Sequence, residues 1–188
     1  LDNDRLHHAY LFTGTRGVGK TTIGRILSKC LNCETGVSSV PCGECSSCTE
    51  IDAGRFIDLI EVDAASRTGV DDMRDLLDNV QYAPSRGRFK IYLIDEIHML
   101  SKSSFAALLK TLEEPPPRTH IILSAAEDSS LMPTIRSRCA SVRLGLPDSA
   151  AASELLATQL GLDAATAMRL LRMAGGRPGP LLEAGVTG

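Results

Sequence analysis

A glycine-rich run near the N-terminus has the residue types and spacing of a phosphate-binding loop, G-x-x-x-x-G-K-[ST]. Its residues, with the threonine that follows, are Gly14, Thr15, Arg16, Gly17, Val18, Gly19, Lys20, Thr21 and Thr22. The glycines let backbone N–H groups converge on phosphate oxygens at a helix N-terminus, where the helix dipole also favours anions. We expect Lys20 to pair with the β- and γ-phosphates of a nucleotide and Thr21 to place its hydroxyl on Mg²⁺. The alternative, a plain glycine-rich turn before a helix, has no need to end in Lys-Thr.

Two adjacent carboxylates, Asp95 and Glu96, directly follow an apolar run that predicts a buried strand. Open α/β sheets bind ligands at the carboxyl ends of their strands. We therefore expect Asp95 to hold Mg²⁺ directly or through water, and Glu96 to polarise an attacking water as a general base. A solvated strand end is the alternative, but the acidic pair and the glycine-rich loop together are far more specific than either alone.

Four closely spaced cysteines follow the pattern C-x8-C-x2-C-x2-C. They are Cys33, Cys42, Cys45 and Cys48. Four thiolates are a standard closed shell for structural Zn²⁺; an iron–sulfur cluster and free structural thiols are the alternatives. The surrounding segment, 32–50, is rich in Cys, Gly, Ser and Pro and has no helical or strand period, so we expect zinc to order it. Cys30, three residues before Cys33, could compete for the metal, but we expect it to be a small buried hydrophobe.

The elements that position these residues alternate between strand and helix. Apolar runs predict strands over 9–13, 56–62, 89–94, 120–123 and 140–144. Helical spacing predicts a helix after the glycine-rich loop, one over 70–80, one that Ser101 caps and Pro115 ends, and one around 131–137. Repeated strand–helix units with right-handed crossovers predict an α/β fold with a doubly wound parallel sheet.

The character of the chain changes near residue 145, after which Ala, Leu and Gly dominate and the pattern is helical. We predict a nucleotide-binding domain over 1–145, with the zinc insertion at 32–50, and a partial helical lid domain over 146–188.

Composition limits the class of protein. With 188 residues, 43% of them hydrophobic and 23% charged, the chain can bury a core, which excludes a disordered or fibrous protein. No apolar run approaches the ~20 residues of a membrane-spanning helix, so we expect a cytoplasmic protein with no membrane partner. The net charge of -3 gives no global attraction to nucleic acid. A basic cluster of Arg86, Arg88 and Lys90 is interpreted as a solvated face rather than a DNA contact.

The stretch from residue 7 to 117 closely resembles the γ/τ subunit family of bacterial DNA polymerase III. The strings GTRGVGKTT, YLIDEIHMLS and TLEEPP, together with the cysteine set, carry this resemblance. It implies a P-loop NTPase of the AAA+ class that uses ATP, Mg²⁺ and Zn²⁺ and loads a sliding clamp on primed DNA during replication. It also implies partners: other γ/τ subunits, δ, δ′, the sliding β clamp and, in the assembled complex, primed DNA.

The resemblance assigns the same roles to Lys20, Thr21, Asp95 and Glu96 as the motifs do, and zinc to the four cysteines. It adds Arg138, because Ser137-Arg138-Cys139 matches the family's Ser-Arg-Cys motif, whose arginine reaches the ATP site of the neighbouring subunit. Such an arginine contributes about 10³- to 10⁵-fold in rate. From the residues alone, a cation at a helix C-terminus is the favoured interpretation.

From Thr119 onward the chain resembles the δ′ subunit more than γ/τ. Ala125 and Ala126 stand where γ/τ has threonines, so the polar sensor near the γ-phosphate is expected to be missing, and Arg177 is not assigned a sensor role. We expect weak ATPase activity in the isolated chain. A non-hydrolysing δ′-like scaffold that supplies Arg138 to a neighbour is the alternative function, and another P-loop enzyme such as a helicase is a weaker one.

Overall fold

The computed structural model describes residues 6–64, 80, 82–127 and 131–186. They form two compact units, one containing the sheet and ending at Val142, the other containing Gly14–Lys20 and the chain from Arg143 onward. The helix predicted over 70–80 lies outside the described residues, apart from its last position. The division into domains at residue 145 stays a prediction.

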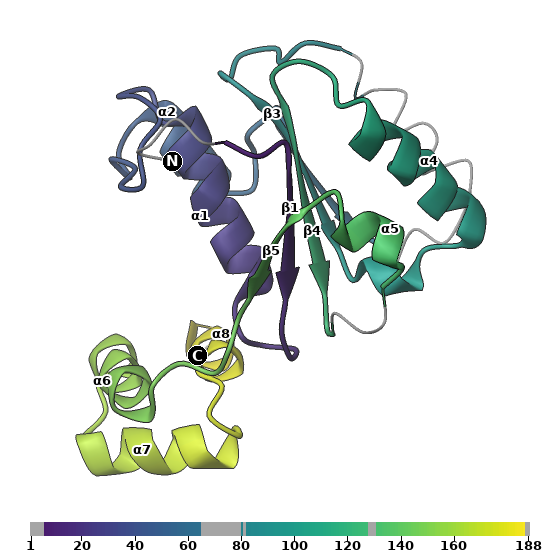
Figure 1. The fold of residues 1–188 in the computed structure, drawn as a ribbon. Helices are drawn as coiled ribbons and strands as arrows, with labels where there is room; N and C mark the ends of the chain where they lie inside the picture. The colour runs from purple at the N-terminus through teal and green to yellow at the C-terminus, as the bar shows by residue number, and fades with distance from the viewer. Residues whose placement is uncertain (1–5, 65–79, 81, 128–130, 187–188) are drawn as a thin grey trace. The chain divides into compact units, whose positions relative to one another are not determined.

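A five-stranded sheet with the order β2-β3-β4-β1-β5 forms the first unit. Its strands are β1 (Ala9–Thr13), β2 (Leu59–Asp63), β3 (Lys90–Asp95), β4 (Thr119–Ala125) and β5 (Ala140–Arg143). The β1–β4, β2–β3 and β3–β4 pairs are parallel. Helix α1 (Lys20–Asn32) lies on one face, and α4 (Lys102–Glu113) and α5 (Pro133–Arg136) lie on the other, as Figure 1 shows. The predicted doubly wound parallel sheet is confirmed.

The two faces of the sheet have separate cores. Leu123, Tyr92 and Ile94 belong to a large buried cluster with side chains of α4 and α5. On the opposite face α1 lies very close to the strands, because a Cβ atom added to Gly24 would come 2.8 Å from Leu93 Cδ1 and 3.6 Å from Ile122 Cγ2. Glycine at this position therefore sets how closely α1 packs on the sheet.

Strand β2 begins later than the sequence predicts, at Leu59 rather than at residue 56. The difference has a local cause: Ile57 is 65% exposed, and the carboxylate of Asp58 is used as an acceptor by the backbone of another loop. These residues therefore lead into the strand instead of pairing within it.

The start and end of α4 follow the predicted signals. The Ser101 hydroxyl accepts a hydrogen bond from the backbone N–H of Ser104 at 3.2 Å, as an N-cap does. The helix ends at Glu113, two residues before the first proline of the Pro115–Pro117 run.

The cysteine-rich segment is partly helical, which corrects the expectation that it has no regular structure. Helix α2 (Ser46–Asp52) occupies its end and buries Cys48 and Ile51. These two residues are three apart and share one side of a helix. The apolar pair was too short a pattern to show a helical period in the sequence.

Three helices form most of the second unit: α6 (Ser149–Leu160), α7 (Ala164–Met173) and α8 (Gly179–Val186). Asp148 caps α6 and Asp163 caps α7, each through side-chain oxygens that accept backbone N–H groups. Their shared core contains Ala152, Leu156, Ala167 and Leu171. Among the residues that the structure describes, no helix is both long and apolar enough to cross a membrane.

Candidate nucleotide and zinc sites

The glycine-rich loop joins β1 to α1, as its motif requires. Gly19 has φ 89°, a backbone conformation that glycine adopts at little cost, and it directly precedes the lysine. The Lys20 side chain is buried within the loop, where its Nζ donates to the carbonyl oxygens of Gly14 at 2.9 Å and Thr15 at 3.4 Å. The ammonium group is thus enclosed by the loop that is expected to bind phosphate. Thr15, Arg16 and Thr22 are exposed, and Gly14, Gly17, Val18, Gly19 and Thr21 are half-buried.

An arginine to which the sequence assigned no role lies against this loop within the second unit. Arg177 donates from Nη1 to the carbonyl of Arg16 at 3.4 Å and from Nε to the carbonyl of Ala174 at 3.1 Å. Its Cδ would lie 3.4 Å from a Cβ added to Gly17. The sequence did not indicate this contact, because Arg177 does not occupy the position that the arginine has in the lid pattern of γ/τ.

Two hydroxyls and one backbone N–H donate to the carboxylate at the end of β3 in the first unit. The Thr21 hydroxyl donates to Asp95 Oδ2 at 2.8 Å, although the two residues are 74 positions apart. The other oxygen, Oδ1, accepts from the Ser124 hydroxyl and from the backbone N–H of Glu96 at 3.0 Å. A hydroxyl and a carboxylate are oxygen donors of the type that Mg²⁺ prefers, so the predicted pair Thr21 and Asp95 fits this ion.

Glu96 has an unusual backbone conformation. Its φ of 52° and ψ of 48° are left-handed, which costs a residue other than glycine roughly 1–2 kcal/mol. Its side chain turns toward His98, whose Nδ1 lies 3.2 Å from Oε2. The short 3-10 helix η2 (Ile97–Met99) begins directly after it. Backbone strain of this kind is concentrated at functional sites, and the catalytic role of Glu96 stays a prediction.

Ser124 was not predicted as a site residue from the sequence, because the polar sensor position was assigned to Ala125 and Ala126. Ala125 is buried in the cluster on the α4 face of the sheet, whereas Ser124 alternates to the other face. Ile94 of β3 pairs with Leu123 of β4, so the residues that follow them, Asp95 and Ser124, are next to each other in the register. The available signal was a lone serine in a strand whose other central residues are apolar.

The four predicted cysteine ligands come together in the first unit. Their sulfur atoms all lie within 4.8 Å of one another. Four sulfurs at about 2.3 Å from a zinc ion lie about 3.8 Å apart, so the cluster is close to the size of a tetrahedral shell. Cys30 is 3% exposed and is not a member of this group, as expected for a small buried residue. The donor set fits Zn²⁺.

The environments of these thiols are unequal. Hydrogen bonds from the Cys42 N–H and with the Thr35 hydroxyl lower the pKa of Cys33 to about 6. Burial raises the pKa of Cys48 to about 12. Since a bound metal needs thiolates, zinc binding would have to remove a proton from Cys48, whereas Cys33 offers a thiolate near neutral pH.

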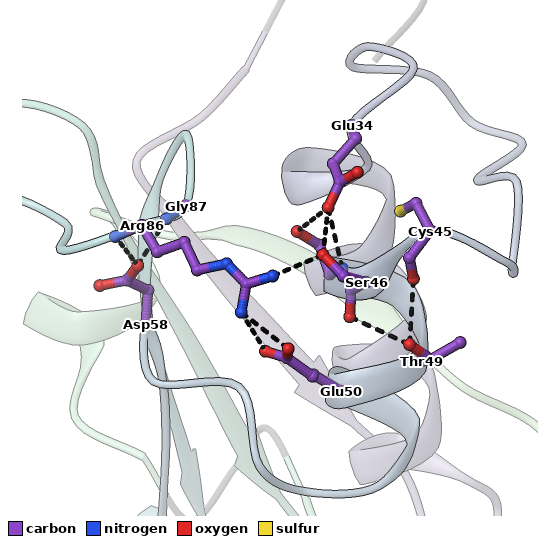
Figure 2. A network of polar contacts seen from close by, with 9 residues as sticks. Glu34, Cys45, Ser46, Thr49, Glu50, Asp58, Arg86 and Gly87 are labelled. Atoms are coloured by element: carbon purple, nitrogen blue, oxygen red, sulfur yellow. Dashed lines mark hydrogen bonds and ion pairs between the residues drawn. The ribbon is translucent and has the colours of Figure 1, made fainter.

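Two arginines of the basic cluster, Arg86 and Arg88, contact the cysteine-rich segment and the helix before it. Arg86 Nη1 pairs with Glu50 at 2.7 Å, and its Nη2 donates to the Ser46 hydroxyl at 2.5 Å, so that both contacts fall on α2 (Figure 2). Arg88 donates to the carbonyl oxygens of Leu31 at 3.2 Å and Cys33 at 3.0 Å. The exposed Arg86 agrees with the interpretation of the cluster as a solvated face, although it also binds α2, whereas the half-buried Arg88 makes structural contacts with backbone carbonyls.

Arg138 lies two residues after the end of α5 at Arg136. It donates to the carbonyl of Thr134 at 2.7 Å and pairs with Glu113 at 2.7 Å, and a third of its side chain is exposed. The first contact is the helix-end interaction that the residues alone suggested. Next to it, burial raises the pKa of Cys139 to about 11, which makes this thiol a packing residue.

Comparisons with known proteins agree with this architecture. A family model described as "DNA polymerase III, delta subunit" matches residues 1–147. The chain is 66% identical over 139 residues to the DNA polymerase III subunit tau of Salmonella typhimurium, covering 74% of this chain and 22% of the relative. It is 59% identical over 157 residues to the subunit tau/gamma of Haemophilus influenzae, covering 84% of this chain and 23% of the relative. The chain thus spans less than a quarter of the length of these relatives.

Solved structures show the same fold. A variant of Thermotoga maritima RuvB is similar with a TM-score of 0.67 and 18% identity, covering 98% of this chain and 54% of that one. A DNA polymerase III gamma subunit-related protein of the same organism has a TM-score of 0.57 and 22% identity, covering 89% of this chain and 55% of that one. The predicted AAA+ P-loop fold is confirmed.

Proposed function

The chain belongs to the family described as DNA polymerase III, delta subunit, and from this premise we propose that it is the ATP-binding part of a clamp-loader subunit of the γ/τ kind. The observation that carries the proposal is the hydrogen bond from Thr21 to Asp95. It joins the end of the phosphate-loop motif to the acidic pair across 74 positions of sequence, as a nucleotide site of this class requires.

In this proposal Lys20 pairs with the β- and γ-phosphates of ATP, and Thr21 and Asp95 hold the metal ion. Mg²⁺, when bound, neutralises charge on the phosphate oxygens. Glu96 orients the attacking water and takes up its proton. The complete loop and the carboxylate of Glu96 favour hydrolysis over the non-hydrolysing scaffold, which needs neither group.

Arg138 acts on the ATP site of a neighbouring subunit in this proposal. Its partial exposure supports the role, and the ion pair with Glu113 has to open when the guanidinium reaches a phosphate. The proposed partners are other clamp-loader subunits (γ/τ, δ and δ′), the sliding β clamp and, in the assembled complex, primed DNA. Zn²⁺ has a structural role at the four cysteines.

Binding and turnover are tested separately. By calorimetry with Mg²⁺, we expect the chain to bind ATP and Lys20→Ala to lose that binding, whereas the control Lys29→Ala on the same helix retains it. In an assembly with δ, δ′, clamp and primed DNA, Glu96→Gln keeps ATP binding and loses turnover by about 10²- to 10⁴-fold. Undiminished ATPase activity of Glu96→Gln contradicts the assignment of the general base.

The role of Arg138 has its own outcome in the same assembly. Arg138→Ala lowers turnover by about 10³-fold or more and leaves ATP binding to its own chain intact, while Arg136→Ala, at the last residue of α5, has little effect. Full activity of Arg138→Ala in the assembly contradicts its role as the neighbour's arginine.

A further inference from the structure

Ser124 is a buried polar residue whose hydroxyl is committed to the acidic pair. It is 0% exposed and lies near the end of β4, between apolar neighbours. A hydroxyl taken out of water is costly unless it is hydrogen-bonded. Ser124 Oγ donates to Asp95 Oδ1 and accepts from the backbone N–H of Glu96 at 3.3 Å. One hydroxyl thus contacts both members of the acidic pair.

The register of the sheet explains why this serine, and not the next residue, reaches Asp95. Ile94 and Leu123 are partners in the parallel β3–β4 ladder, and both point into the cluster beneath α4. The following residues, Asp95 and Ser124, therefore point to the α1 face. That face receives the N-terminal part of α1, because Gly24 packs against Leu93 there.

The two oxygen atoms of the Asp95 carboxylate bind different parts of the fold. Oδ2 accepts from Thr21 on α1, whereas Oδ1 accepts from Ser124 on β4 and from the N–H of Glu96. A carboxylate offers about four lone-pair sites, and three are used, so at least one remains for a ligand. Rotation of the carboxylate would break bonds on both sides at once, which fixes its orientation.

We propose that Ser124 is a positioning residue that orients the Asp95 carboxylate for Mg²⁺-nucleotide and holds the backbone of Glu96. The next two residues, Ala125 at the end of β4 and Ala126 directly after it, have no polar side chain. The inference rests on the proposed function, because it concerns the same nucleotide site. Groups that hydrogen-bond to a metal ligand typically contribute about 10- to 100-fold to metal affinity or activity.

The test compares nucleotide binding with and without Mg²⁺. A fluorescent ATP analogue is titrated into the chain in excess Mg²⁺ and again in EDTA, and thermal melting reports on folding. For Ser124→Ala we expect the affinity in Mg²⁺ to fall by about 10-fold while the affinity in EDTA is unchanged. Ser28→Ala is the matched control, because Ser28 is also 0% exposed and its hydroxyl donates to the carbonyl of Gly24.

A second pair of variants separates the hydroxyl from the shape of the side chain. Thr and Val have nearly the same shape, so Ser124→Thr keeps the donor and Ser124→Val removes it with the same added volume. We expect Ser124→Thr to bind Mg²⁺-nucleotide about 10-fold more tightly than Ser124→Val. This comparison holds even if Ser124→Ala melts too early to be titrated.

The binding measurements can overturn the role of Ser124 in several ways. Equal losses in Mg²⁺ and EDTA, no loss, a loss equal to that of Ser28→Ala, or equal affinities of the Thr and Val variants would each overturn the role of Ser124. If the unsubstituted chain binds the analogue no better in Mg²⁺ than in EDTA, the proposed function fails and the inference falls with it. Normal binding by the unsubstituted chain, with no effect of the Ser124 variants, overturns the inference alone.

Discussion

Asp58 holds a loop by three backbone hydrogen bonds, and replacing it with asparagine tests how much that loop depends on it. The residue is 1% exposed. Its Oδ1 accepts from the N–H of Ser85 at 2.7 Å, and its Oδ2 accepts from those of Arg86 at 2.7 Å and Gly87 at 2.6 Å (Figure 2 shows the latter two residues beside it). Asn keeps the shape but turns one acceptor oxygen into an NH₂ donor.

The magnitude follows from these contacts. In either orientation of the Asn amide, at least one backbone N–H faces another donor and loses its acceptor. A hydrogen bond to a charged group contributes about 1.5–3 kcal/mol, and the bonds that survive weaken because the acceptor becomes neutral. We therefore expect Asp58→Asn to lower the free energy of unfolding by about 2–4 kcal/mol.

The assay is equilibrium unfolding in urea at constant zinc, with linear extrapolation to water. Asp52→Asn is the matched control, because Asp52 pairs with Lys29 at the surface and half of its side chain is exposed. Exposed ion pairs contribute about 0–1 kcal/mol, so the control should be nearly neutral. A loss below about 1 kcal/mol for Asp58→Asn, or one equal to the control, would refute the reasoning from buried donors.

Two further outcomes follow from the zinc and histidine environments. Cys45→Ser should lower both the bound zinc, measured by atomic absorption, and the melting temperature, whereas Cys139→Ser leaves the zinc content unchanged; full zinc occupancy in Cys45→Ser would contradict the four-sulfur shell. Burial lowers the pKa of His120 below its ordinary value of 6.5, which favours the neutral ring in the folded state. The stability that depends on this neutral ring is present above pH 6.5 and is lost as the pH falls through the lowered folded-state pKa. His120→Gln should therefore melt with a shallower dependence on pH in this acidic range, and equal slopes for the two proteins at fixed zinc would count against it.

Local patterns were sufficient to predict the parts of the fold that local forces determine. The phosphate loop, β1 and α1 are adjacent in the chain, and the run of apolar residues before Asp95 could be a strand on length and composition alone. Topology then predicts the meeting of Thr21 and Asp95, because both lie at the carboxyl edge of a parallel sheet. The first step needs only the local sequence, and the second needs only the alternation of strands and helices along the chain.

Contacts between distant segments were not predictable in the same way. Ser124 depends on the register of β4 against β3, which no local pattern records. Arg86 and Arg88 looked like a solvated charge cluster because their partners on α2 and at the end of α1 are dozens of residues away. The turn formed by Asp58 appeared as part of a strand, since its neighbours are apolar and the loop that it holds lies beyond residue 80.

The positions of these contacts indicate that the start of the cysteine-rich segment supports the end of the sheet opposite the proposed nucleotide site. Arg88 bonds the carbonyl oxygens of Leu31 and Cys33 at the C-terminal end of α1, and the next residue, Phe89, exchanges hydrogen bonds with Asn32 at 2.8 and 3.0 Å. Strand β3 begins immediately afterwards. These hydrogen bonds therefore join the C-terminal end of α1 to the start of β3.

The two proposed Mg²⁺ ligands lie at the other ends of these same two elements. Thr21 is in the first turn of α1, and Asp95 is the last residue of β3. A helix of 13 residues rises by about 20 Å, so the zinc cluster is too far from Asp95 to act on a phosphate. We expect the cluster to affect the proposed nucleotide site only through the alignment of α1 with β3. Removal of zinc should therefore lower the melting temperature more than it disturbs the contact between Thr21 and Asp95.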